Sequence, residues 1–179
     1  MRRADALELL LPPADEARVL AAWGALRGAG IPSQGDRTGG SHRPHVTLCA
    51  GPSVPADRRP ALAAGATRWL GDRWAAAGLT VLGGRRPLVV LRLDPPPGVR
   101  AWQQEAVSRW PGADARPWVP HLTLSRPLGP HHLGTEAVAE ALCAVGEVVA
   151  PHLPPDVGGS ALRWWDPGAG TASVLAGRA

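Results

Sequence analysis

The sequence contains Pro44-His45-Val46-Thr47-Leu48 and, further along, the closely matching stretch Pro120-His121-Leu122-Thr123-Leu124. In a β-strand, successive side chains point to opposite faces, so the histidine and the threonine of each copy share one face. The two aliphatic residues of each copy then lie on the reverse face and anchor the strand. Each copy is therefore predicted to be a strand that presents an imidazole beside a hydroxyl. Two such strands facing each other would form one site with two histidines and two threonines.

Length and composition suit one domain or two closely packed lobes, because the chain has 179 residues, of which 45% are hydrophobic. All 19 basic residues are arginines, and the net charge is +4. A positive excess favours anionic partners such as phosphates and nucleic acids, although arginines on a solvated surface would give the same balance. The chain has eight tryptophans and no phenylalanine or tyrosine, so a stacked nucleobase would meet tryptophan or arginine.

The two cysteines, Cys49 and Cys143, lack Cys-x-x-Cys spacing, so the sequence supports neither a disulfide framework nor a zinc site. We expect both thiols to be reduced and buried. Strand alternation places Cys49 on the face of His45 and Thr47, where it would flank the site. No apolar stretch reaches membrane-spanning length, and the apolar run 9–11 is too short for a signal sequence. We therefore expect a cytoplasmic protein without membrane contact.

Strand and helix patterns alternate along the rest of the chain. Strand patterns cover residues 6–11, 45–50, 79–82, 88–93, 118–126, 147–150, 161–165 and 171–175. Helical spacing of apolar residues covers residues 14–27, 57–70, 99–110 and 135–145, and residues 32–43 are predicted to form a loop. Hairpin signals at Gly83-Gly84-Arg85-Arg86 and at residues 166–170 favour antiparallel pairing. The predicted fold class is α+β.

The paired Pro-His-x-Thr-Leu motifs resemble those of the 2H phosphoesterases, in particular the bacterial 2′–5′ RNA ligase-like or RNA 2′,3′-cyclic phosphodiesterase branch. The resemblance implies a bilobal fold, in which two antiparallel-sheet lobes with helices packed outside are related by a pseudo-two-fold axis around a central cleft. It implies a single domain over residues 1–179 with one motif in each of two intertwined lobes. By position, the resemblance implies four catalytic residues, which are His45, Thr47, His121 and Thr123. It also implies that Arg126 binds the phosphate. The first motif continues without a matching arginine.

The implied reaction opens a 2′,3′-cyclic phosphate with water and leaves the phosphate on the 2′ position. The resemblance also implies a reversible 2′–5′ RNA ligation. Imidazole serves as base or acid near neutral pH, so two histidines on opposite sides of phosphorus permit in-line attack. The threonine hydroxyls and Arg126 would hold the non-bridging oxygens. For hydrolysis we expect His121 to be the base and His45 the acid, with the roles exchanged for ligation. No metal or other cofactor is required. We expect a monomer that acts on RNA 2′,3′-cyclic phosphate ends or on small cyclic or 2′–5′ nucleotides.

Two residues next to the motifs are candidates for further substrate contacts. Trp118 precedes the second motif, where its ring would stack on a nucleobase or else fill the core. Arg43 precedes the first motif, where its guanidinium would meet the phosphate or lie in solvent.

Other interpretations stay open on the sequence alone. The motif histidines could be hydrogen-bonded core residues without a catalytic role. His42-x-x-His45 or the adjacent His131-His132 could bind a metal ion, although no carboxylate or cysteine stands at complementary spacing. The chain could also be a non-catalytic RNA-end or nucleotide-binding protein of the same fold, which the intact histidines of both motifs disfavour.

Overall fold

The computed structural model contains two four-stranded sheets, and it describes residues 4–37, 39, 42–83, 87–128 and 137–177. The strand order of the first sheet is β2 (His45–Gly51), β1 (Asp5–Leu10), β7 (Ala161–Asp166) and β8 (Thr171–Gly177). That of the second sheet is β5 (His121–Thr123), β4 (Leu88–Asp94), β3 (Arg73–Leu82) and β6 (Asp156–Gly158). Every neighbouring pair is antiparallel. The expected α+β class is therefore confirmed, and each motif strand lies at the edge of its sheet.

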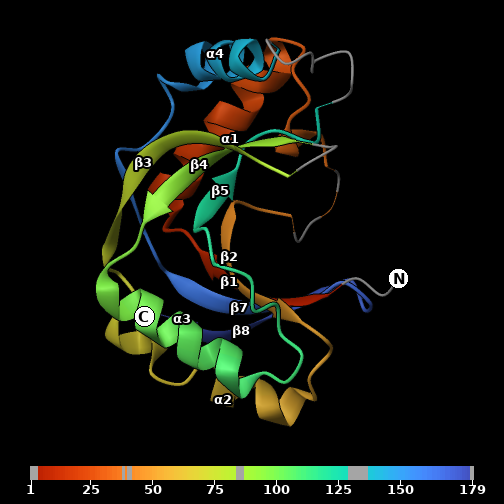
Figure 1. Cartoon of the computed structure of the whole chain (residues 1–179), viewed down its shortest axis with the longest axis vertical. Coiled ribbons are helices and arrows are strands. Elements are labelled where there is room, and N and C mark those ends of the chain that lie inside the picture. Colours follow the sequence, from red (N-terminus) through yellow and green to blue (C-terminus); the bar gives the residue numbers. More distant parts are fainter. Residues whose placement is uncertain (1–3, 38, 40–41, 84–86, 129–136, 178–179) are drawn as a thin grey trace.

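Two of the helices pack away from the sheet whose strand precedes them in the sequence. The α-helices are α1 (Pro13–Gly28), α2 (Arg59–Leu62), α3 (Pro97–Arg109) and α4 (Ala137–Val149). Helix α1 follows β1 of the first sheet but contacts α4, which packs on β3 of the second sheet. Helix α3 follows β4 of the second sheet but contacts β2 of the first. Accordingly, α1 and α4 lie at one end of the molecule and α2 and α3 at the other, with the motif strands β2 and β5 side by side between them (Figure 1). None of the described helices is long and apolar enough to span a membrane.

Helix α1 shows how the local sequence sets an element. It begins after Pro12, with a proline at the first helical position, and Asp15 and Glu16 lie in the first turn, where acidic side chains complement the helix dipole. Its buried side chains recur at helical spacing and include Val19 and Trp23. The chain then leaves the helix through Gly30, whose φ of +71° favours glycine.

Two predicted elements are wrong in type or extent. The predicted strand 147–150 belongs mostly to α4, because Val145 and Val149 are both buried at helical spacing. The predicted helix 57–70 is broken into a short 3₁₀-turn at Ala56–Arg58, α2, and a second 3₁₀-turn at Ala66–Arg68. Gly65, with φ +78°, separates α2 from the second turn.

The predicted strands of the second sheet differ in length from the observed ones. Strand β3 begins at Arg73 rather than at residue 79, and its alanine-rich start lacks the β-branched residues that mark a strand. The predicted strand 118–126 forms a ladder only over β5, because Pro120 has no N–H and the next two N–H groups after Thr123 both donate to the carbonyl of Val89. Strand β6 lies between the predicted strands 147–150 and 161–165, where no strand is predicted. The predicted turn 84–86 and the start of the predicted helix 135–145 lie outside the described residues.

Tryptophans supply the aromatic part of the core. Trp74, Trp110 and Trp164 are among the largest fully buried side chains. The indole N–H of Trp110 donates to the carbonyl of Pro52 at 2.9 Å, and that of Trp164 donates to a carboxylate oxygen of Asp5 at 3.1 Å. A buried indole N–H gains from such a partner. The buried indole nitrogens of Trp69 and Trp74, in contrast, have no hydrogen-bond partner among the described residues.

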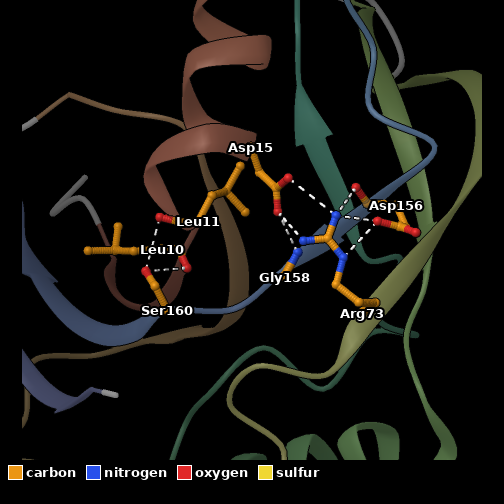
Figure 2. Close-up of polar contacts among 7 residues, drawn as sticks. All are labelled: Leu10, Leu11, Asp15, Arg73, Asp156, Gly158 and Ser160. Atoms are coloured by element: carbon orange, nitrogen blue, oxygen red, sulfur yellow. Dashed lines mark hydrogen bonds and ion pairs between the residues drawn. The ribbon is translucent and has the colours of Figure 1, made fainter. Parts of the chain in front are cut away.

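A polar cluster joins the two sheets where the chain passes from β6 to β7 (Figure 2). Arg73 of β3 donates from Nη1 to Asp15 Oδ2 at 2.7 Å and from Nε to Asp156 Oδ1 at 2.7 Å. The same Asp15 oxygen accepts the N–H of Gly158 at 2.8 Å. Ser160 then donates from Oγ to the carbonyl of Leu11 at 3.0 Å. The buried carboxylate of Asp15 therefore ties the start of α1 to two strands of the second sheet.

We expect Asp15→Ala to lower the free energy of unfolding by about 2–3 kcal/mol, because it leaves the Gly158 N–H without its acceptor and removes one partner of Arg73. Asp15→Asn keeps an acceptor and should lose less. Urea unfolding followed by circular dichroism measures both. Asp72→Ala, at an exposed carboxylate, is the control and should stay within about 0.5 kcal/mol of the native chain. An equal loss in Asp15→Ala and Asp72→Ala contradicts the assignment of this cluster.

Candidate active site

The two motif histidines are held by the same device. Nδ1 of His45 lies 2.8 Å from the carbonyl oxygen of Arg43, and Nδ1 of His121 lies 2.7 Å from the carbonyl oxygen of Val119. A carbonyl oxygen only accepts, so each Nδ1 carries the hydrogen and donates it to the residue two positions earlier. Nε2 of each ring is then left for chemistry, with a lone pair in the neutral form.

The threonines of the two motifs are also anchored alike. The carbonyl oxygen of Thr47 accepts the indole N–H of Trp118 at 2.9 Å, and that of Thr123 accepts the indole N–H of Trp23 at 3.0 Å. In each motif the histidine and threonine are half-buried while the aliphatic residue between them is buried, as the strand alternation predicts.

A cavity of about 840 Å³ opens beside the motif strands. Its lining comes from both sheets and from the loops next to them, and it includes Glu8, His45 and Arg163 of the first sheet, Leu122 and Thr123 of the second, and Arg37, His42 and Arg126 of the loops. Of the four predicted catalytic residues, His45 and Thr123 line this cavity, whereas Thr47 and His121 do not. Thr47 and His121 lie on the same two strands as His45 and Thr123, and these strands, β2 and β5, contact each other.

The environment of His121 favours its neutral form. Burial lowers the pKa of His121 below the usual 6.5, the hydrogen bond to the carbonyl of Val119 raises it in part, and the charge of His45 lowers it further. An imidazole that stays neutral at physiological pH can accept a proton.

The arginines predicted at the site differ in their surroundings. Arg126 is exposed and lines the large cavity, and its main-chain N–H donates to the carbonyl of Pro32 at 2.9 Å. Arg43 forms a bidentate ion pair with Glu16, with Nε donating to Oε1 at 2.8 Å. The guanidinium of Arg43 is therefore engaged by α1, while its carbonyl holds His45.

Trp118 lies outside the large cavity. Its ring packs edge-on against Trp74 at 6.0 Å between centroids, and it lines a separate cavity of about 380 Å³ with residues of α3, Gln103 among them. Its indole N–H binds the carbonyl oxygen of Thr47 in the first motif strand. Trp165, from β7, is instead the tryptophan of the last hairpin that lines the large cavity.

Cys49 is not beside the site, which corrects the prediction for this thiol. The pairing of β1 with β2 slips at a β-bulge, where Leu7 pairs with Cys49 and Glu8 pairs with Thr47. The extra residue, Leu48, reverses the alternation, so that Leu48 and Cys49 are both buried in the core. Burial raises the pKa of Cys49 to about 12. The prediction for Cys143 is also wrong, because this thiol is exposed.

Two charged residues of the site were missed. Glu8 and Arg163 are buried, both line the large cavity, and Nε of Arg163 donates to Glu8 Oε2 at 2.6 Å. The other carboxylate oxygen, Oε1, lies 3.3 Å from His45 Nε2. The available signal was a single glutamate within the apolar strand Ala6–Leu11, where a charge has no structural reason to be.

Of the histidines considered for a metal site, His42 has other partners. His42 stacks on Trp23 with a centroid distance of 5.2 Å, and its Nε2 lies 3.1 Å from the carbonyl of Gln34. His131 and His132 lie outside the described residues. Within the described residues, no group of three or more His, Cys, Asp or Glu side chains is arranged to hold a metal ion.

Known structures share this arrangement of two sheets. Escherichia coli LigT complexed with 3′-AMP superposes with a TM-score of 0.55 at 18% identity, covering 97% of this chain and 94% of that one. A phosphoesterase superposes with a TM-score of 0.53 at 16% identity, covering 98% and 96%. The PDE domain of MHV ns2 has a TM-score of 0.50 at 14% identity, covering 72% and 86%. At such identities the likeness concerns the fold, which is that of the phosphoesterases.

The sequence itself matches the family model of the 2′-5′ RNA ligase superfamily over residues 11–166. The chain belongs to this superfamily, and the resemblance to the 2H phosphoesterases is confirmed. Family and fold together point to phosphoesterase activity. Among curated proteins, none matches this sequence.

Proposed function

We propose that this chain is a metal-independent phosphodiesterase that opens 2′,3′-cyclic phosphates to 2′-phosphates by two-histidine acid/base catalysis. The observation that supports it best is the matched tethering of His45 and His121. Each Nδ1 is bound to the carbonyl two residues earlier, on edge strands that contact each other. This tethering leaves Nε2 of each ring as the nitrogen available for proton transfer. His45 lines a cavity that Arg126 also lines, and His121 lies on the strand that contacts β2.

In the forward reaction, Nε2 of neutral His121 takes a proton from water while the water oxygen bonds to phosphorus. The bond between phosphorus and the 3′ oxygen breaks, and the 3′ oxygen keeps the electron pair of that bond. This oxygen then accepts a proton from Nε2 of His45. The phosphate stays on the 2′ oxygen. Ligation follows the same steps with a 5′ hydroxyl in place of water: the 5′ oxygen bonds to phosphorus, the 3′ oxygen leaves, and the two histidines keep their roles. They exchange roles when the 2′–5′ bond is cleaved back to the cyclic phosphate, which corrects the exchange expected for ligation.

The non-bridging oxygens of the phosphate need donors as charge rearranges. Thr47 and Thr123 share a face with the histidines, so their hydroxyls are the nearest donors. Arg126 adds a guanidinium on the side of the second motif, and charge-assisted hydrogen bonds of this kind are the stronger ones.

The substrate proposed is an RNA 2′,3′-cyclic phosphate end or a small cyclic or 2′–5′ nucleotide. A cavity of about 840 Å³ lies within the range of small-ligand sites, which supports a nucleotide or the end of a chain as the bound part. The E. coli relative was solved in complex with 3′-AMP, which agrees with a nucleotide as the ligand. We propose further that the chain acts as a monomeric single domain in the cytoplasm.

The test is turnover of 2′,3′-cyclic substrates by the purified chain in the presence of a chelator. We expect a 2′,3′-cyclic mononucleotide or an RNA oligomer with such an end to be hydrolysed, and the ratio of their kcat/KM values reports the substrate length. Binding without turnover would instead favour a non-catalytic nucleotide-binding protein. Loss of turnover on chelation that is restored by a divalent metal contradicts the metal-independent mechanism.

The pH dependence should report the neutral form of His121. Because its pKa is lowered by burial, His121 stays neutral until the pH falls below the usual imidazole value of 6.5. We expect kcat/KM to decrease with falling pH only below that value, with a limiting slope of about one proton. A pH–rate profile under chelation measures this. An acidic limb centred at or above the ordinary imidazole pKa contradicts the assignment of His121 as the base.

A further inference from the structure

A buried ion pair stands behind His45 in the first sheet. Glu8 lies on β1 between β2 and β7, where it pairs with Thr47 on one side and with Arg163 on the other. The side chains of Glu8 and Arg163 are only 5% and 7% exposed. Glu8 thus presents one carboxylate oxygen to the guanidinium at 2.6 Å and the other to His45 Nε2 at 3.3 Å.

Fold stability does not explain this pair. Taking two charges out of water costs several kcal/mol for each ion, and well-packed apolar residues of similar volume are often as stable or more so. The neighbours of Glu8 along the strand, Leu7 and Leu9, are fully buried apolar residues. The charged pair lies at this one position, next to a motif histidine and within the cavity wall. An effect on His45 therefore explains the pair better than fold stability does.

The contact places a carboxylate oxygen at Nε2 of His45. Its Nδ1 already donates to the carbonyl of Arg43, so Nε2 is the atom that gains or loses the catalytic proton. With Nε2 protonated, the imidazolium faces an anion. With Nε2 deprotonated, a lone pair faces that anion, which is unfavourable. A distance of 3.3 Å is longer than the usual N–H···O hydrogen bond, so the proton is not held by Glu8 alone and can be donated into the cavity.

The second histidine lacks this arrangement among the described residues. His121 has the carbonyl of Val119 at Nδ1, and the charge that affects it is that of His45. Other charged or titratable groups near His45 among the described residues include His42, Arg43 with its ion-pair partner Glu16 on α1, and His121 from β5. Glu8 is the one carboxylate that forms an ion pair with a motif histidine within the described residues.

We propose that Glu8, balanced by Arg163, is a positioning residue that keeps His45 protonated at Nε2 and so makes it the general acid. Arg163 has a second effect, because its charge offsets a carboxylate that would otherwise repel an anionic substrate from the cavity wall. This inference rests on the proposed function for its catalytic consequence, but the protonation of His45 can be measured without a substrate.

The test is Glu8→Gln, which keeps the shape and an acceptor for Arg163 but removes the negative charge. We expect kcat with a 2′,3′-cyclic substrate at mildly alkaline pH to fall at least about tenfold, with little change in KM, and the alkaline limb of the pH–rate profile to move to lower pH. Glu8→Asp keeps the charge on a shorter side chain and should restore part of the rate. Glu105→Gln makes the same change in an exposed Glu–Arg pair on α3 and should leave the profile unaltered.

NMR of the imidazole nitrogens measures the protonation of His45 without a substrate. We expect the imidazolium form of His45 to persist to higher pH in the native chain than in Glu8→Gln, and to an intermediate pH in Glu8→Asp. If Glu8→Gln does not fold, Glu8→Asp alone still decides, since a retracted carboxylate must move the His45 titration toward lower pH. An unchanged His45 titration together with an unchanged pH–rate profile overturns the inference. A shifted titration in a chain that hydrolyses no cyclic phosphate supports the inference and overturns the proposed function.

Discussion

His121→Ala and His45→Ala should each lower kcat for 2′,3′-cyclic phosphate hydrolysis by about a hundredfold to ten-thousandfold, the range that general acid–base catalysis contributes. The first variant removes the base that takes the proton of water, and the second removes the acid that protonates the leaving 3′ oxygen. Steady-state rates with a cyclic mononucleotide or an RNA oligomer measure both. The losses in the double variant should be far from additive, because the two groups act in one step.

The control for these variants is His152→Ala. His152 lies in the turn after α4, outside both cavities, and only its backbone is seen to form hydrogen bonds. This variant should keep the native rate, and circular dichroism should show all three variants folded. Near-native turnover in either motif variant contradicts the two-histidine mechanism.

Arg126→Ala should lower kcat/KM by about ten- to a hundredfold, since a hydrogen bond to a charged group contributes about 1.5–3 kcal/mol. Arg126 is exposed and lines the cavity, so its removal leaves no buried charge unpaired. Arg126→Lys should recover only part of the loss, because an ammonium does not reproduce the bidentate fork. Initial rates over a range of substrate concentrations give both constants.

The matched control is Arg109→Ala, on the exposed face of α3, where the arginine pairs with Glu105. Its kcat/KM should equal that of the native chain at the same ionic strength. Equal losses in Arg126→Ala and Arg109→Ala would mean that the net charge of the chain, rather than a contact at the phosphate, is what matters.

The motif strands could be predicted from the sequence because their geometry is local. Alternation alone places each histidine with its threonine, and Val46 and Leu122 are buried on the reverse face as expected. The same rule failed at Cys49, two residues after Thr47. The β-bulge there depends on the partner strand β1 and cannot be predicted from the sequence of β2.

Other misses have similar causes. The charge of Glu8 could be noticed in its strand, but its partners His45 and Arg163 come from strands on either side of β1 and meet it only in the sheet. The valines near the end of α4 favour a strand by local propensity, whereas burial of Val149 against the core continues the helix. Long-range packing thus decided the elements and residues that local patterns could not.

The most direct test of the central claim is the identity of the product formed from a 2′,3′-cyclic phosphate in ¹⁸O-enriched water with a chelator present. The two-histidine mechanism predicts a 2′-phosphate that carries one ¹⁸O atom, because the water oxygen bonds to phosphorus as the 3′ oxygen leaves. A 3′-phosphate product, a product without ¹⁸O in its phosphate, or no product at all would contradict it.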